Sequence, residues 1–102
     1  MPSFTIRKTN DPADVSAFLG LFEPNGESSM HARLVVDEGE WDLWLAHAAG
    51  QGSGRELAGG ALCREMTDEA GARRGVEDNL IVDREFRRQG LARRLLGVIE
   101  AH

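Results

Sequence analysis

The chain has 102 residues, enough for one domain with a modest core. Its 41% apolar and 28% charged residues are typical of a globular protein, and its net charge of −5 disfavours nucleic-acid binding. No apolar run approaches the roughly 18 residues of a membrane helix, and residues 1–10 do not resemble a signal peptide. A single cysteine, Cys63, excludes an intrachain disulfide. These features predict one cytoplasmic domain over residues 1–102, with no membrane partner.

The beginning of the chain predicts a strand and then a helix. Residues 4–8 alternate between apolar and polar side chains, as strands do. Asp11 is expected to cap the helix, with Pro12 at the first helical position. The apolar face of this helix is predicted from four residues at helical spacing, Val15, Phe18, Leu19 and Phe22.

A second, weaker helix is predicted after a turn that contains proline and glycine. Ser28 or Ser29 is its expected N-cap, and the helix extends to about Val36. Met30 and Leu34 lie four residues apart, so they are expected on its inner face.

The middle of the chain predicts two strands, over residues 41–48 and 57–66. Residues 50–54 between them are rich in glycine and serine and predict a flexible hairpin loop. This loop is not a phosphate loop, because it lacks the Gly-Lys-Ser/Thr ending and a following helix. Gly59 and Gly60 predict a bulge or a close backbone contact within the second strand.

The last stretch, residues 76–101, is the most informative, and it predicts a strand, a tight basic turn and a helix. Side chains alternate along residues 76–82, and the apolar end of this segment predicts a strand covered on both faces. After Gly90, one apolar helix face is predicted from Leu91, Leu95, Val98 and Ile99.

The basic turn has the features of an anion site. A helix that begins near Gly90 leaves its first backbone N–H groups without intrahelical acceptors, and the helix dipole favours an anion there. Gly90 and Ala92 are small, so a phosphate can approach the backbone closely. Positive charge around the opening comes from Arg87, Arg88, Arg93 and Arg94. The turn therefore predicts a pyrophosphate cradle.

The segment VDREFRRQGLA, residues 82–92, resembles motif A of the GCN5-related N-acetyltransferase (GNAT) family. The turn of that motif has the pattern Gln/Arg-x-x-Gly-x-Gly/Ala. The matching positions, including the preceding valine and a common aromatic, are Val82, Phe86, Arg87, Gly90 and Ala92. Arg84 stands where the family often has proline, which we expect to change only the stiffness of the strand exit.

The resemblance implies an α+β fold of order β-α-α-β-β-β-α, an antiparallel sheet with helices packed on it. In the family, the fourth strand diverges from a parallel fifth strand, and acetyl-CoA lies in the gap. Nothing in this sequence corresponds to the fifth strand or to the later elements. A truncated chain, a naturally short protein that dimerises, and a non-catalytic relic would each explain this. An unpaired fourth-strand edge predicts self-association, through that edge or by swapping the last helix.

The resemblance also implies which residues bind the cofactor. Backbone groups of Leu80, Ile81 and Val82 are expected to bind the pantetheine arm as an added strand would. The pyrophosphate is expected to lie against the run Arg88, Gln89, Gly90, Leu91, Ala92 and Arg93. Arg87 belongs to the motif and is expected to orient the turn.

The family reaction is the direct transfer of an acetyl group from CoA to an amine. A carboxylate on the last strand is the expected general base, and Glu77 and Asp78 are the two candidates, on opposite faces of a regular strand. The usual acid of the family is a tyrosine on a later helix, and this chain has no tyrosine. The expected function is acetyl-CoA-dependent N-acetylation of a primary amine of a small molecule or protein. The alternative is a non-catalytic CoA-binding or protein-interaction module.

The charge distribution agrees with these partners. Residues 1–72 contain five basic and twelve acidic side chains, and residues 73–102 contain seven basic and five acidic ones. A basic end suits an anionic cofactor, and an acidic remainder suits a cationic amine.

Other polar and aromatic residues have structural explanations. Cys63 is expected in the core, and the three histidines lack metal-ligand spacing, so no metal is expected. His31 is a candidate to flank the substrate region. Of Trp41 and Trp44, which lie on opposite strand faces, one is expected in the core, and the other is a candidate to line a substrate pocket.

Overall fold

The computed structural model describes residues 3–49, 55–67 and 69–100, with the backbone alone for residues 55, 65–67 and 73–78. The elements in chain order are β1 (Phe4–Thr9), α1 (Pro12–Leu19), the 3₁₀ turn η1 (Glu23–Asn25), α2 (Met30–Glu38), β2 (Asp42–Ala49), β3 (Arg55–Thr67), β4 (Arg73–Val82), the 3₁₀ turn η2 (Arg84–Phe86) and α3 (Leu91–Glu100). This confirms the element order expected from the sequence. The hairpin loop predicted over residues 50–54 lies outside the described residues.

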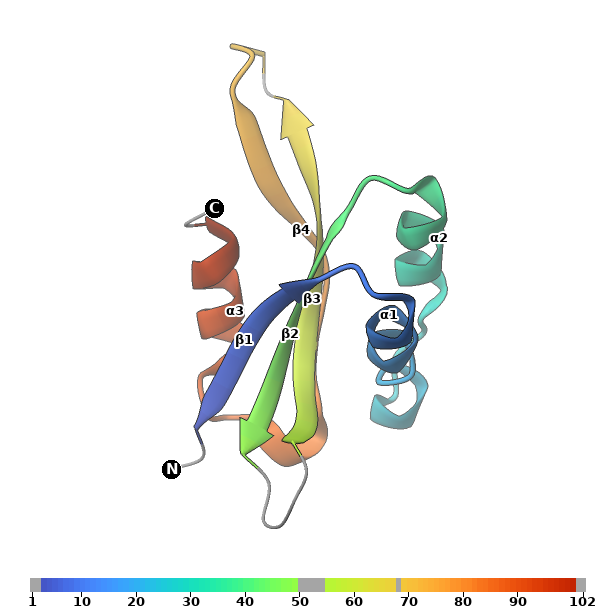
Figure 1. The fold of residues 1–102 in the computed structure, drawn as a ribbon, viewed down its shortest axis with the longest axis vertical. Helices are drawn as coiled ribbons and strands as arrows, with labels where there is room; N and C mark the ends of the chain where they lie inside the picture. The colour runs from blue at the N-terminus through green and yellow to red at the C-terminus, as the bar shows by residue number, and fades with distance from the viewer. Residues whose placement is uncertain (1–2, 50–54, 68, 101–102) are drawn as a thin grey trace.

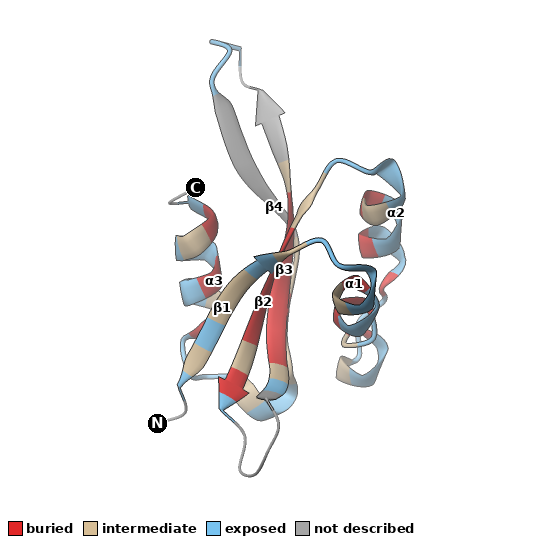
Figure 2. Cartoon of the chain, in the orientation of Figure 1, coloured by how far each residue is buried: buried red, intermediate tan, exposed pale blue. Residues whose placement is uncertain are grey.

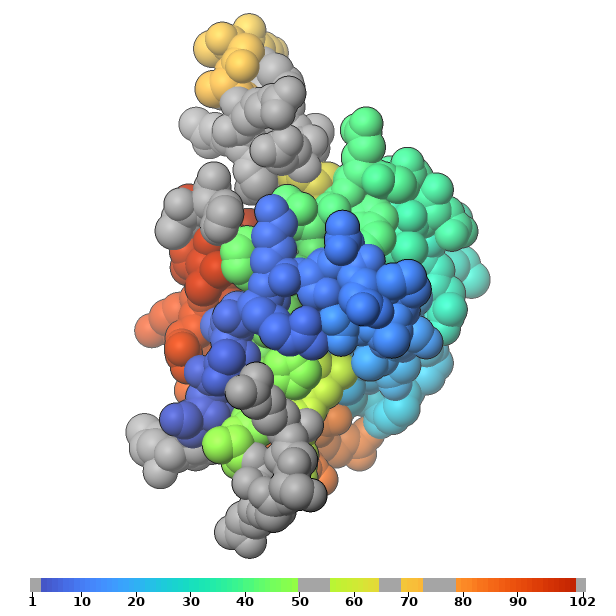
Figure 3. Space-filling view, viewed as in Figure 1, coloured from blue at the N-terminus to red at the C-terminus, as the bar shows by residue number. Residues whose placement is uncertain are grey.

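The four strands form one antiparallel sheet in the order β1-β2-β3-β4. Figure 1 shows α1 and α2 on one face of this sheet and α3 on the other. The hairpin of β3 and β4 extends beyond the body of the sheet, and Figure 3 shows its tip at the top of the molecule. With this hairpin the molecule is 48 Å long, and it measures 26 and 23 Å in the other two directions.

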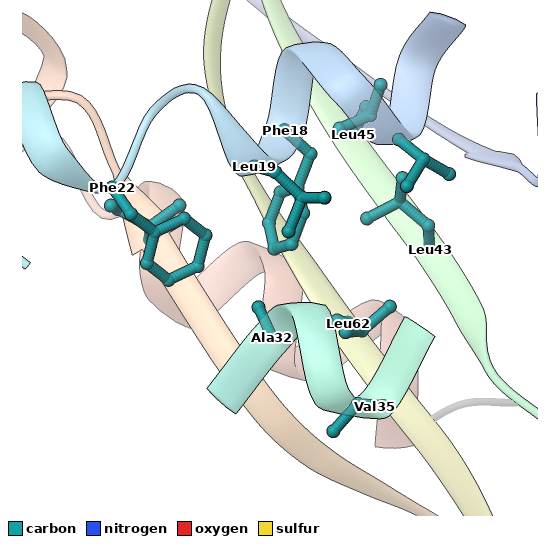
Figure 4. Close-up of a cluster of buried hydrophobic side chains, with 10 residues drawn as sticks. Phe18, Leu19, Phe22, Ala32, Val35, Leu43, Leu45 and Leu62 are labelled. Carbon is teal, nitrogen blue, oxygen red and sulfur yellow. The ribbon is translucent and has the colours of Figure 1, made fainter. Parts of the chain in front are cut away.

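The larger core lies between the sheet and the layer of α1 and α2 (Figure 4). Its buried residues are Val15, Phe18, Leu19, Phe22, Ala32, Val35, Leu43, Leu45, Leu62 and Ile81. The start of α1 is as predicted, because the Asp11 side chain accepts from the Ala13 amide at 2.8 Å and Pro12 is the first helical residue. All four residues of the apolar face predicted for α1 are buried, although the helix itself ends at Leu19 and Phe22 follows in a turn.

The inner face predicted for α2 is wrong. Met30 and Leu34 are 69% and 57% exposed, whereas Ala32 and Val35 are buried. The sequence offers two apolar stripes on this helix, and Val36, which is partly buried, belongs to the second one. The smaller side chains of that stripe let the helix approach the sheet closely, and this outweighs the size of the methionine and leucine.

On the opposite face, α3 packs against the sheet through its predicted stripe. The buried residues of this second core are Trp44, Ala46, Ala48, Ala58, Ala61, Cys63, Leu91, Leu95 and Ile99, as Figure 2 shows for the central strands and the inner side of α3. Each leucine or isoleucine buried there stabilises the fold by roughly 1.5–3 kcal/mol. The prediction of a core position for Cys63 is confirmed. Among the described residues, no helix is long and apolar enough to cross a membrane.

The two tryptophans lie on opposite sides, as predicted. Trp44 is 8% exposed beneath α3, and Trp41 packs against the core under α1 and α2. The indole N–H of Trp41 donates to the Val36 carbonyl at 3.0 Å. Both side chains therefore contribute to packing, and Trp41 also lines a shallow pocket with Lys8.

Two register shifts interrupt the sheet. The pairing of β2 with β3 shifts beside Gly59, which confirms the irregularity predicted there. The pairing of β3 with β4 shifts so that Cys63 lies opposite Glu77 and Leu62 opposite Asn79, which leaves Asp78 as the extra residue. The regular backbone alternation expected along residues 76–82 is therefore interrupted at Asp78.

Candidate cofactor-binding site

The segment from the end of β4 to the start of α3 forms an open pocket. In Figure 1 this orange segment passes beneath the lower end of the sheet to reach α3. The pocket has a volume of about 610 Å³ and is lined by Val82, Phe86, Arg87, Arg88, Gly90, Leu91, Ala92, Arg93 and Leu96. Most of the turn predicted as a phosphate cradle is thus gathered around one cavity.

The first amides of α3 carry the positive end of the helix dipole to this pocket. The Arg94 amide donates to the Gly90 carbonyl at 3.1 Å, and this is the first bond of the helix. Within the described part of the chain, the amides of Leu91, Ala92 and Arg93 have no hydrogen-bond acceptor. They are therefore able to donate to an anion.

Two residues of the turn have left-handed backbone angles, Arg88 with φ 66° and Gly90 with φ 76°. A Cβ atom at position 90 would meet nothing within 4 Å, so the backbone conformation, not a lack of space, favours glycine there. A left-handed arginine costs about 1–2 kcal/mol. Strained residues of this kind cluster at functional sites, and turns of this kind form concave anion sites from successive N–H groups.

The four arginines differ in what their side chains contact. Arg87 donates from Nε to the Val82 carbonyl at 3.0 Å, so it ties the turn to the end of β4. Arg88 and Arg93 are exposed and line the pocket. Arg94 is expected at the opening but instead donates from Nη2 to the Phe4 carbonyl at 3.5 Å, away from it.

The backbone of β4 is available along its outer edge, because no strand of the described chain pairs there. The Asp83 amide donates to the Ala58 carbonyl at 2.8 Å, next to the Gly59–Val82 pair. Since opposite residues in an antiparallel pair alternate between bonded and non-bonded, the backbone groups of Leu80 and Val82 point to the open edge. Those of Ile81 point to β3, and its side chain is 2% exposed in the core.

The sequence profile of the Acetyltransferase (GNAT) family matches residues 12–102. The chain belongs to the GNAT acetyltransferase family. No curated protein sequence matches it. Among solved structures, this GNAT chain is similar to an aminoglycoside acetyltransferase from an uncultured soil metagenomic sample, with a TM-score of 0.70 and 16% identity over 97% of this chain and 70% of that chain.

Two further GNAT-like structures have the same fold. NAA60 from Arabidopsis thaliana, solved with a bisubstrate analogue, gives a TM-score of 0.70 and 18% identity over 95% of this chain and 64% of that chain. Ribosomal-protein-alanine N-acetyltransferase from Brucella melitensis gives a TM-score of 0.69 and 17% identity over 94% of this chain and 69% of that chain. The GNAT chain described here therefore spans about two thirds of the length of these neighbours.

The remaining site residues predicted for the GNAT chain are only partly placed. Gln89 is exposed and does not line the pocket. The side chains of Glu77 and Asp78 lie outside the described residues. His31 lies on α2 with its Nδ1 2.9 Å from Nδ2 of Asn79, so it contacts β4 and not the basic turn.

Sequence reasoning missed three residues that support this GNAT pocket. Leu96 adds to the apolar wall, although it lies outside the buried stripe of α3. The Phe4 ring meets Phe86 edge-on with centroids 6.0 Å apart, and Asn25 binds the backbone of Arg84. These last contacts join distant parts of the chain, so no local pattern reveals them.

Proposed function

We propose that this GNAT chain binds acetyl-CoA at the segment between β4 and α3 and transfers its acetyl group to a primary amine of a small molecule or protein. The observation that carries the proposal is the set of three acceptor-free amides at the start of α3, beside a cavity of about 610 Å³. Arg87, Arg88 and Arg93 surround the same cavity. A diphosphate supplies the negative charge and the acceptor oxygens that this arrangement favours.

The rest of CoA extends from this point along the edge of β4. The backbone groups of Leu80 and the amide of Val82 are the partners we assign to the amide groups of the pantetheine arm, because the Val82 carbonyl already accepts from Arg87. Ile81 belongs to the same predicted set, and its part is to anchor the strand in the core. Gln89 contributes through the main chain of the run from Arg88 to Arg93, which we assign to the pyrophosphate.

Bound acetyl-CoA supplies a thioester, whose C–S bond breaks as the amine nitrogen forms the new C–N bond, with the sulfur taking up a proton. The amine must first lose a proton, and we assign this step to Glu77 or Asp78. Asp78 is the extra residue at the register shift of β4. Such bulges commonly re-aim a side chain beside an active site.

Calorimetry with CoA tests binding, and release of free thiol from acetyl-CoA in the presence of a panel of amines tests catalysis. The proposal predicts both heat and amine-dependent thiol. No heat up to millimolar CoA would contradict the site. Binding without thiol release would favour the second candidate, a non-catalytic CoA-binding module.

We also propose that the open edge of β4 pairs with a second copy of the chain. Unpaired backbone groups at a strand edge recruit other strands. In this chain the edge includes the backbone groups of Leu80 and the amide of Val82, whose carbonyl accepts from Arg87. Sedimentation at high micromolar concentration is expected to show dimers. Added CoA is expected to reduce the dimer fraction, because it competes for the same edge of β4. A monomer over the whole concentration range would contradict this pairing.

A single buried cysteine, Cys63, suits the reducing cytoplasm that we propose as the location.

A further inference from the structure

We propose that Asn25 is a positioning residue for the phosphate-binding turn, and that with Arg84 it replaces the stiffness a proline would give at position 84. The inference rests on the proposed function for its effect on CoA. The hydrogen bonds that join Asn25 and Pro24 to Asp83 and Arg84 form a clasp between the two segments.

The clasp begins at the half-buried amide of Asn25, between α1 and α2. Its Oδ1 accepts from the Arg84 backbone amide at 2.9 Å. Its Nδ2 donates to the Leu21 carbonyl at 2.7 Å and lies 3.4 Å from Oδ2 of Asp83. The Arg84 guanidinium also donates to the Pro24 carbonyl. Every polar atom of the Asn25 side chain is thus used, and the turn between the helices is fixed to the exit of β4.

The exit of β4 leads directly into the proposed cradle. Asp83 caps η2 by accepting from the Glu85 amide at 3.0 Å, and the Phe86 amide donates to the Asp83 carbonyl at 2.9 Å. Arg87 then bonds back to Val82. Only three residues separate Arg87 from Leu91, the first residue of α3. A change in the backbone position of residue 84 is therefore expected to alter the positions of the acceptor-free amides at the start of α3.

The identity of residue 84 connects the clasp with the resemblance to motif A. A proline at this position has no N–H and could not donate to Asn25. Asp83 has φ −58° and ψ 141°, the extended conformation that a following proline favours, and position 84 begins a helical turn, where proline is tolerated. The sequence predicts that Arg84 changes only the stiffness of the strand exit. In the structure Arg84 also has a second effect, because it lacks the rigid ring of proline but forms hydrogen bonds to Asn25 and Pro24 in the turn between α1 and α2.

The test compares the whole chain with Asn25→Ala, Arg84→Pro and the double variant. Two quantities are measured: CoA affinity by calorimetry, and the order of the amides of residues 84–93 by ¹⁵N relaxation. Asn25→Ala is expected to weaken CoA binding roughly three- to tenfold, because the net free energy of one such hydrogen bond corresponds to about that ratio of affinities. The same variant is expected to increase the motion of those amides. Arg84→Pro and the double variant are expected to stay near the parent chain. The control Asn10→Ala removes an exposed asparagine near the start of α1 and is expected to change neither quantity.

Three results would overturn the inference. The first is unchanged CoA affinity and amide order in Asn25→Ala. The second is that Asn25→Ala lowers CoA affinity equally whether residue 84 is arginine or proline, and the third is that Asn10→Ala lowers it as much as Asn25→Ala does. If Asn25→Ala does not fold, Arg84→Ala replaces it, because that variant loses the bond to Pro24 at an exposed position. Arg84→Ala is then expected to be more mobile than Arg84→Pro, and equal order in the two would count against the clasp. If the parent chain binds no CoA, the proposed function fails, and the relaxation data alone decide the inference.

Discussion

At Gly90, one backbone angle shapes the proposed cradle. Its φ of 76° is tolerated by asparagine and aspartate better than by other side chains, and there is open space for a Cβ. We therefore expect Gly90→Asp and Gly90→Asn to fold alike. The two variants differ by one negative charge beside the acceptor-free amides.

Calorimetry with CoA separates this charge from the shape of the side chain. Gly90→Asp is expected to bind at least about tenfold more weakly than Gly90→Asn, because a carboxylate repels the diphosphate and competes for the same amides. Equal affinities would show that the phosphates lie elsewhere.

A second prediction at the residue scale concerns Asp14, in the first turn of α1. Its carboxylate receives two bonds from Arg7, at 2.8 and 3.0 Å, and one from Thr9 at 2.7 Å. These bonds, that of Arg7 first, lower the pKa of Asp14 from its ordinary value of 3.8 to about 2. The folded pKa is the lower one, so the stabilisation is present above about pH 4 and is lost as the pH falls towards 2.

The variant Asp14→Asn tests this by urea unfolding at several pH values. At pH 7 its midpoint is expected below that of the parent chain, and the gap is expected to narrow between about pH 4 and pH 2. A gap that does not change with pH would mean that the charge of Asp14 contributes nothing to stability.

At the scale of elements, helix faces were predictable where a single apolar stripe exists. Leu91, Leu95 and Ile99 of α3 form one such stripe and are buried. In α2 two stripes compete, and only the fit against the sheet decides between them, so Met30 was assigned wrongly. The bulge at Asp78 was also beyond prediction, because it depends on the register between two strands.

Close packing at Gly60 gives an element-scale prediction. A Cβ there would lie 2.8 Å from Cδ1 of Phe18 and 2.9 Å from the Trp44 carbonyl, where α1 meets the sheet. Gly60→Ala is therefore expected to lower the free energy of unfolding by about 1–3 kcal/mol. Gly97→Ala is the matched control: position 97 is exposed in α3 with nothing near its Cβ, and this variant is expected to raise the free energy by roughly 0.5–1 kcal/mol. The same sign for both variants in urea unfolding would contradict the packing argument.

At the scale of the whole molecule, the turn of the site was predictable and its support was not. Gly90 and Ala92 belong to one short segment, so their relation to the helix start can be derived from neighbouring residues. The contacts of Asn25 with Arg84 and of Phe4 with Phe86 cross between layers of the fold. They depend on how α1 and α2 pack on the sheet and on where β1 pairs within it, which no local pattern specifies.

The central claim is that amides opening α3 bind the diphosphate of CoA while the edge of β4 binds its pantetheine arm. Titration of ¹⁵N-labelled chain with CoA, followed by amide chemical shifts, tests both halves together. The account predicts the largest shifts at Gly90, Leu91, Ala92 and Arg93, with smaller ones at Leu80 and Val82. Shifts confined to other elements, or none up to millimolar CoA, would contradict it.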